Sequence, residues 1–198
     1  MDVRDSKSAL RAMLREKGRG LSPEYVAASD KAIADNIISS SFFASARSIF
    51  IYVSFGFEPD TRRIIDAALR SGKRVYVPFI TGPGSMLARR LSDLSDLVPG
   101  RFGILTVPSD AETIDAADFD LALVPCVSVS PDGVRLGNGG GYYDRFFAGS
   151  RGQCLSLVLC RAQLMCDSIP SEAHDVKFDG IVTEDGLIME NCKWEMAN

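Results

Sequence analysis

The 198-residue chain has no long apolar run and no excess of basic residues, and each absence excludes a class of protein. A membrane-spanning helix needs about 18 or more consecutive apolar residues, and none occurs. The N-terminus lacks a signal peptide's apolar core, and Asp2, Asp5 and Glu16 argue against a transit peptide. Because 26 acidic residues outnumber 22 Lys and Arg, the net charge of −4 argues against a general nucleic-acid binder. We therefore expect a cytoplasmic protein that binds neither nucleic acid nor a membrane.

Cysteine and histidine are also scarce. The five cysteines include no C-x-x-C pair, so neither a zinc site nor a disulfide framework is expected, and a reducing cytosol fits best. The only histidine is His174, and a lone histidine in a polar loop is more often structural than catalytic. Cys126 would need a low pKa and exposure to count as reactive. The chain therefore offers no obvious nucleophile or general base.

Alternating helix and strand patterns predict one α/β domain over residues 1–198. A basic helix is expected over 5–17, and a second begins at Ser22-Pro23, a pair typical of helix starts. Short apolar runs bounded by turns predict buried strands, and a helix between the first two gives a strand–helix–strand unit. The predicted strands are 48–53, 73–79, 121–127 and 154–160, with a helix over 61–71, a less regular region over 81–118 and a hairpin around Asp185-Gly186. We expect a three-layer domain whose mainly parallel central sheet is flanked by helices.

The most unusual segment is Arg135 to Phe146, RLGNGGGYYDRF, which holds four glycines within five residues. Glycine reaches positive φ at little cost, and a bare loop before a helix offers N–H donors suited to phosphate. The run is neither a Walker A loop nor a dinucleotide fingerprint, since no Lys-Ser/Thr follows it and Tyr142 stands at the third glycine position. A flexible glycine-rich linker is the alternative. Because ligands bind at the carboxyl ends of strands, this loop and Glu58 are expected to face one cleft.

Three further motifs accompany the glycine run in order along the chain. They are SKSALR near the N-terminus, SFGFEPDT after the first predicted strand and HDVKFDGIVTE near the C-terminus, with LVPCVSVSPDGVRLGNGGGYYDRF between the last two. Together they resemble the 5-formyltetrahydrofolate cyclo-ligase family, also called 5,10-methenyltetrahydrofolate synthetase. The resemblance implies that ATP and Mg²⁺ drive closure of 5-formyltetrahydrofolate to 5,10-methenyltetrahydrofolate. The formyl oxygen would be phosphorylated before N10 attacks, and ADP and phosphate would be released.

The resemblance also implies roles for individual residues. Contacts to ATP would come from Lys7, Arg11, Arg135, Leu136, Gly137, Asn138, Gly139, Gly140, Gly141, Tyr142 and Tyr143. Folate would meet Val53, Glu58, Asn138, the three glycines after it and Tyr142; Asp144 and Asp175 would hold Mg²⁺, and Tyr142 and Arg145 would act in catalysis. Without the resemblance, the helix face that carries Lys7 and Arg11 would more often be a surface exposed to solvent. Asp144 would more often be an acid in the first turn of a helix that stabilises the helix dipole. From the residues alone, Glu58 is equally well explained as an ordinary acid in a turn or as a folate ligand. Tyr143 is likewise open to a place in the core instead of a contact with substrate.

One departure from the family pattern keeps an alternative open. Some relatives carry a lysine within the glycine run, whereas this loop has none, so its phosphate charge would fall to Lys7, Arg11, Arg135 and Arg145 with the metal. A non-catalytic reduced-folate-binding protein is therefore the second reading, and an α/β enzyme acting on sugar phosphates or coenzyme A esters is the third. The folate would be free or polyglutamylated, with Arg89-Arg90 as a tail site. The protein would be a monomer or weak dimer.

Overall fold

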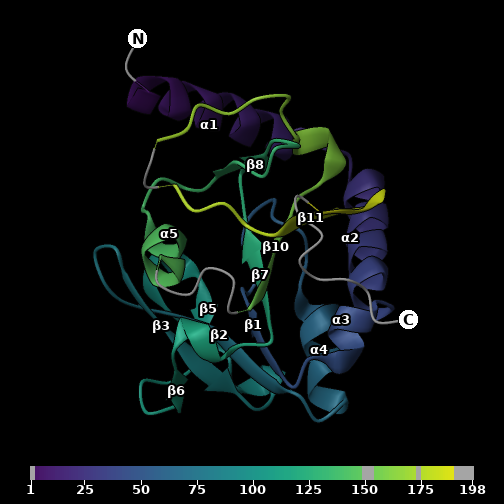
Figure 1. Ribbon diagram of the computed structural model, residues 1–198, viewed down its shortest axis with the longest axis vertical. Coiled ribbons are helices and arrows are strands. Elements are labelled where there is room, and N and C mark those ends of the chain that lie inside the picture. Colours follow the sequence, from purple (N-terminus) through teal and green to yellow (C-terminus); the bar gives the residue numbers. More distant parts are fainter. Residues whose placement is uncertain (1–2, 149–153, 173–174, 190–198) are drawn as a thin grey trace.

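Eight strands form the central sheet in the computed structural model, which describes residues 3–148, 154–172 and 175–189 (Figure 1). Their order across the sheet is β12 (Gly186–Met189), β11 (Gly180–Thr183), β10 (Leu155–Leu159), β7 (Leu121–Pro125), β1 (Ser48–Ile51), β2 (Arg74–Gly82), β3 (Ser85–Leu91) and β6 (Thr113–Ile114). The five strands from β11 to β2 pair in parallel, whereas β11–β12, β2–β3 and β3–β6 are antiparallel. The predicted mainly parallel sheet is confirmed.

Helices lie on both faces of this sheet. The helices are α1 (Val3–Arg19), α2 (Pro23–Ile38), α3 (Ser41–Ser45), α4 (Arg62–Arg70) and α5 (Tyr142–Phe147). The Ser22 side chain caps α2 by accepting from Tyr25 N, as the serine–proline start predicted. Figure 1 shows α2, α3 and α4 beside one face of the sheet and α5 beside the other. This arrangement confirms the three layers.

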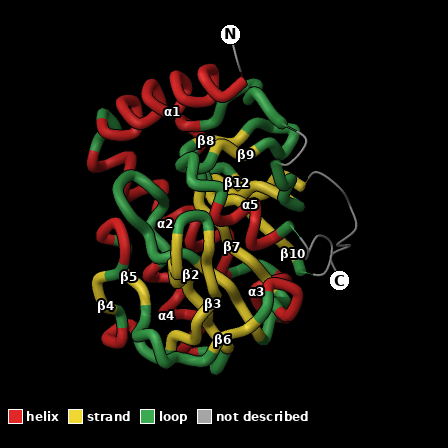
Figure 2. The backbone as a smooth tube through the Cα atoms, turned by 90° about the vertical axis from the view of Figure 1, so that its left-hand side faces the viewer, coloured by secondary structure: helices red, strands yellow, loops and turns green. Residues whose placement is uncertain are grey.

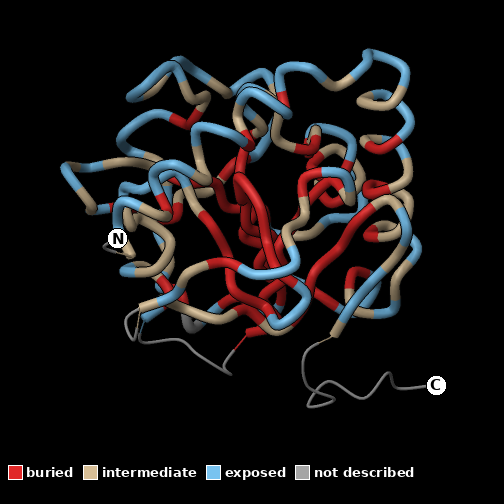
Figure 3. The backbone as a smooth tube through the Cα atoms, turned by 90° about the horizontal axis from the view of Figure 1, so that it is seen from above, coloured by how far each residue is buried: buried red, intermediate tan, exposed pale blue. Residues whose placement is uncertain are grey.

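The buried faces of β1 show how the sequence makes those layers. Ile49 and Ile51 pack with α2 and α4, whereas Phe50 between them points into an aromatic cluster on the opposite face. In that cluster the rings of Phe119 and Phe146 each lie 5.4 Å from the Phe50 ring. Seen from above, the buried strands run through the centre of the molecule, and exposed segments surround them (Figure 3).

The segment expected to be irregular contains a full strand. β3 covers Ser85–Leu91 and pairs with β2 along almost its whole length. Its consecutive arginines, Arg89 and Arg90, interrupt the apolar alternation by which a strand is recognised, but each guanidinium lies over an aromatic ring of β2. The remaining strands are the short pairs β4 (Val98–Pro99) with β5 (Leu105–Thr106) and β8 (Ser128–Val129) with β9 (Arg135–Leu136). Short 3-10 helices cover Leu94–Asp96, Arg101–Gly103, Ala116–Asp118 and Ala162–Leu164.

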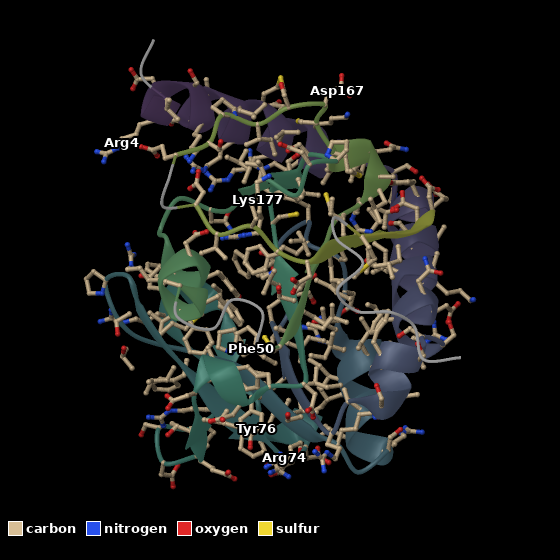
Figure 4. The ribbon with its side chains drawn as sticks, in the orientation of Figure 1. Arg4, Phe50, Arg74, Tyr76, Asp167 and Lys177 are labelled. Carbon is tan, nitrogen blue, oxygen red and sulfur yellow. The ribbon has the colours of Figure 1, made fainter. Side chains whose placement is uncertain are left out.

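Helix α1 lies across the carboxyl ends of the parallel strands (Figures 1 and 2). Arg74, at the start of β2, lies at the opposite end of the molecule (Figure 4). A Cβ atom at Gly18 would lie 2.7 Å from the ring of Phe57, so only glycine lets α1 approach the loop after β1 this closely. Among the described residues, no helix has the length and apolar character needed to span a bilayer.

Candidate functional site

A cavity of about 960 Å³ opens between α1, the loop after β1 and the glycine loop. These segments meet because α1 crosses the edge at which β1 and β7 end, the usual place for ligands in such sheets. Except for Arg89 and Arg90, the residues for which a site role was predicted all line this cavity: Lys7, Arg11, Val53, Glu58, Arg135, Leu136, residues 137–141, Tyr142, Tyr143, Asp144, Arg145 and Asp175. The structure thus brings together residues that lie far apart in the sequence.

The glycine loop presents a bare backbone to the cavity. Gly139 and Gly141 have φ values of +96° and +61°, which side chains rarely adopt. Arg11 Nε donates to the Gly137 carbonyl at 2.7 Å and ties the loop to α1. Within the described part of the chain, none of the backbone N–H groups from residues 138–141 donates a hydrogen bond. These donors are available to an anionic ligand.

Helix α5 after the loop is only six residues long, so its dipole adds little to anion binding. Positive charge comes instead from side chains, since Lys7, Arg11, Arg15 and Arg135 all line the cavity. Burial and the nearby Arg15 lower the pKa of Arg11, but the guanidinium keeps its charge at neutral pH. A loop without a lysine is thus surrounded by cations from α1 and β9.

Arg135 is the buried cation beneath the glycine loop. Its Nη2 atom lies 3.0 Å from Asp144 Oδ2, and Nη1 donates to the Pro125 carbonyl at 3.1 Å. The rings of Tyr143 and Phe178 lie 5.5 and 5.3 Å from its guanidinium carbon. Its Nε atom is buried without a hydrogen-bond partner, which leaves one donor for a bound group.

A second ion-paired carboxylate, that of Asp175, also lines the cavity. Lys7, almost fully buried, places Nζ 2.5 Å from Asp175 Oδ2 and 3.4 Å from Glu172 Oε2. Asp144 Oδ1 lies 3.5 Å from the backbone nitrogen of Val176, so the two aspartates are close in space. The described residues contain no cluster of three or more metal-ligating side chains. Two carboxylates beside a phosphate cradle suit Mg²⁺, which is often held by one or two carboxylates, water and phosphate oxygens.

Glu58 approaches the cavity from the loop after β1. Its carboxylate accepts from Phe55 N at 3.0 Å. Burial raises the pKa of Glu58 from 4.5 to about 7, although the Phe55 hydrogen bond acts in the opposite direction. A group with this pKa changes protonation state near neutrality, and a carboxyl at the wall of a cavity is suited to binding N–H groups of a ligand.

Arg145 holds two loops together in this structure. Its Nε atom donates to the Gly84 carbonyl at 2.8 Å, and Nη2 donates to the Gly140 carbonyl. Gly84 lies in the turn between β2 and β3, where a Cβ atom would lie 2.0 Å from Arg145 Nη2. The ring of Tyr142 packs against Gly140 in the same way, 2.5 Å from a Cβ atom placed there. Both side chains therefore shape the glycine loop from the cavity side.

Sequence reasoning missed several residues that line the cavity. Glu172 and Arg101 are charged, while Phe55 and Phe102 are aromatic residues that are 54% and 68% exposed. Phe102 is the one non-glycine residue with positive φ in the described chain, a conformation that no local pattern indicated. Glu172 lies three residues before Asp175, and its ion pair with Lys7 becomes visible only in the folded chain.

Other sequence expectations fall outside the cavity. Arg89 and Arg90 do not line it. Cys126 is buried and donates to the Leu159 carbonyl, and burial raises the pKa of its thiol, so it is not a reactive cysteine. His174 lies outside the described residues.

Several known proteins resemble this chain in sequence and fold. The sequence matches the 5-formyltetrahydrofolate cyclo-ligase family over residues 3–184. It is 31% identical to the 5-formyltetrahydrofolate cyclo-ligase of Mycolicibacterium smegmatis, covering 90% of this chain and 93% of that protein. It is 29% identical to a probable 5-formyltetrahydrofolate cyclo-ligase of Caenorhabditis elegans, covering 94% and 97%. The NMR structure of Aquifex aeolicus 5,10-methenyltetrahydrofolate synthetase superimposes with a TM-score of 0.83 and 26% identity, covering 93% of both chains.

Proposed function

This chain belongs to the 5-formyltetrahydrofolate cyclo-ligase family and is a ligase, and from that premise we propose how its cavity carries out the reaction. The proposed substrates are 5-formyltetrahydrofolate and ATP, with Mg²⁺ bound to the nucleotide. The observation that carries the proposal is a single cavity shared by a cradle of unpaired N–H groups, four buried or half-buried cations and a carboxyl of raised pKa. The N–H groups and cations would bind the phosphate donor, and the carboxyl would bind the pterin.

The proposed chemistry has two steps. The formyl oxygen on N5 attacks the γ-phosphorus of ATP, a P–O bond to ADP breaks, and the formyl carbon becomes electrophilic. N10 then attacks that carbon, loses its proton, and the C–O bond to phosphate breaks. The products are 5,10-methenyltetrahydrofolate, ADP and inorganic phosphate. Since phosphoryl transfer depends mainly on positioning and charge neutralisation, the lack of a strong nucleophile in this chain is compatible with the reaction.

The phosphates would lie on the backbone of residues 137–141. Arg11 and Lys7 from α1 and Arg135 from β9 line the same cavity and would supply positive charge. The cations that line the cavity supply what a loop lysine supplies in some relatives, so the missing lysine no longer favours a non-catalytic folate-binding protein. Tyr142 and Arg145 would fix the shape of the loop around the transferred phosphate through Gly140.

Asp144 and Asp175 are the carboxylates that would hold Mg²⁺. When bound, the ion would neutralise charge on the phosphate oxygens. Lys7 and Arg135, which now pair with these carboxylates, lie where phosphate oxygens could replace the carboxylates as their partners. Lys7 and Arg135 would thus pair with carboxylates in the empty cavity and with phosphate oxygens in the occupied one.

Glu58 and Val53 would receive the pterin, since both line the cavity on the side of β1. A carboxylate can accept two N–H bonds from the amino-pterin edge, and the buried Val53 side chain offers an apolar wall. A polyglutamylated substrate would extend toward the exposed arginines Arg4 and Arg101, which also line the cavity. Arg89 and Arg90 are no longer proposed for this tail.

An activity assay tests the proposal directly. Purified protein mixed with 5-formyltetrahydrofolate, ATP and Mg²⁺ should develop the methenyl absorbance band and release one ADP for each methenyl product. Omission of either ATP or Mg²⁺ should prevent both signals. Folded protein that binds reduced folate without releasing ADP would instead favour the non-catalytic reading.

Substitution Glu58→Gln should change how stability depends on pH. Because the folded-state pKa of about 7 exceeds the ordinary value of 4.5, the folded protein binds this proton more tightly than the unfolded chain. The wild-type free energy of unfolding, relative to the variant, should therefore fall as pH rises from about 4.5 to about 7. Urea unfolding at about pH 5 and about pH 8 measures this difference.

The matched control is Glu24→Gln, which removes an exposed acid from the first turn of α2. Its difference from wild type should stay nearly constant over the same pH range. A Glu58→Gln difference that is equally flat would show that Glu58 ionises normally in the folded protein.

A further inference from the structure

A buried arginine outside the cavity connects two distant parts of the chain. Arg161 follows β10, and among the described residues its side chain is the largest fully buried one, with 1% relative exposure. It is not among the residues that line the cavity. A guanidinium carries a permanent charge and five N–H donors, so its burial is costly unless partners satisfy them.

The first set of partners lies on α2. Arg161 Nη2 is 2.8 Å from Asp30 Oδ1, and Nη1 donates to the Val26 carbonyl at 3.2 Å. Nη1 also donates to Ser29 Oγ. The ion pair is shielded on the arginine side, and the three contacts fix the guanidinium plane against one face of α2.

The second set lies on the loop after β1. Arg161 Nε donates to the Phe57 carbonyl at 3.2 Å, and Nη2 donates to the Glu58 carbonyl at 3.3 Å. Asp30 Oδ1, already paired with Arg161, also accepts from Asp60 N at 2.8 Å. The Arg161–Asp30 pair therefore fixes the backbone of this loop at three positions.

This loop carries Glu58, whose side chain faces the cavity while its carbonyl faces Arg161. We infer that Arg161 is a positioning residue for folate, which holds the backbone of Glu58 so that its carboxyl meets the pterin. The inference rests on the proposed function. It concerns only the folate end of the cavity, because the glycine loop is held by different residues, Arg11 and Arg145.

Two variants separate positioning from stability. The double variant Arg161→Met, Asp30→Asn removes both charges, so no unpaired charge stays buried, and the amide oxygen introduced at position 30 can still accept from Asp60 N. Arg161→Lys keeps an ammonium for Asp30 but cannot reach all the carbonyls at once. The matched control is Tyr25→Phe, since Tyr25 OH also joins α2 to the segment after β10, through Gln163 N and Glu184, without touching the loop.

Steady-state kinetics and calorimetry on the full chain give the readouts. In the double variant, KM and Kd for 5-formyltetrahydrofolate should rise about tenfold, while those for Mg-ATP stay within about twofold. Arg161→Lys should fall between wild type and the double variant. Tyr25→Phe should lower the melting temperature by a comparable amount and leave both sets of constants unchanged.

The outcomes distinguish this inference from the proposed function. A wild-type protein that turns over, with folate constants unchanged in the folded double variant and in Arg161→Lys, would overturn the positioning role alone. Equal losses for folate and Mg-ATP would also overturn it, because they would indicate a general structural role. A wild type that neither binds 5-formyltetrahydrofolate nor releases ADP would overturn the proposed function and this inference together.

Discussion

Replacing Asp144 by asparagine should lower kcat about a thousandfold, which corresponds to about 4 kcal/mol of lost transition-state stabilisation. The asparagine side chain keeps an oxygen that can accept from Arg135 but has no charge for Mg²⁺. The fold should persist, because the aromatic side chains of the six-residue α5 still pack around Phe147 and asparagine can still accept from Arg135. Methenyl formation at limiting and saturating Mg²⁺ measures the effect, and part of the loss should be recovered at high Mg²⁺.

The control for this variant is Asp132→Asn. Asp132 is an exposed acid in the turn between β8 and β9, where its carboxylate accepts from Ser130 Oγ, and it does not line the cavity. Its turnover should match wild type within about twofold, the range typical of exposed substitutions. Near-normal turnover of Asp144→Asn at limiting Mg²⁺, with an unchanged circular dichroism spectrum, would show that Asp144 is not a metal ligand.

Substitution Gly139→Ala should lower kcat/KM for ATP about a hundredfold, because a small displacement of positioning groups is sufficient for such a loss. The cause is backbone strain, since alanine rarely adopts a φ of +96°. The added Cβ atom itself would lie 3.5 Å from Arg11, an ordinary contact. The loop should therefore move its N–H groups away from the phosphates, while KM for folate changes much less.

Gly186→Ala is the matched control for backbone strain. Gly186, the first residue of β12, has a φ of +133°, and a Cβ atom there would meet nothing within 4 Å. Both variants should lose roughly 1 kcal/mol of stability, but only Gly139→Ala should change the ATP kinetics. If both glycine variants lose the same activity, the loop has no special role in binding phosphate.

Local sequence patterns were sufficient for most of the fold. The apolar run predicted as a strand over 121–127 forms the buried strand β7 over Leu121–Pro125. The Ser22-Pro23 pair begins α2 through a hydrogen bond within the same segment, from Tyr25 N to Ser22 Oγ. β3 was missed because the rings that cover Arg89 and Arg90 belong to another strand. A pattern within the strand cannot show partners on its neighbour.

The candidate site also has features that the sequence predicted and features that it could not predict. The glycine run was recognisable from the sequence, since its residue types are rare outside special backbone conformations. The long-range contacts could not be read from the sequence, because the ion-paired residues Lys7 and Asp175 are 168 positions apart, and Arg161 is 103 positions from Glu58, whose backbone carbonyl accepts its hydrogen bond. Arg145 was expected to face phosphate, yet its hydrogen bonds to Gly84 and Gly140 depend on where the turn after β2 lies.

The position of α1 has a consequence for the order in which the protein assembles. This helix precedes every other described element in the chain, but its hydrogen bonds reach the Gly137 carbonyl, 126 positions later, and Asp175, 168 positions later. Contacts so distant in sequence form late, because closing long loops costs entropy before any contact repays it. We therefore expect α1 to dock last and to exchange its amide hydrogens sooner than β1 or β7. Nucleotide that bridges α1 and the glycine loop should slow that exchange, because a ligand that binds only the docked state of α1 stabilises that state.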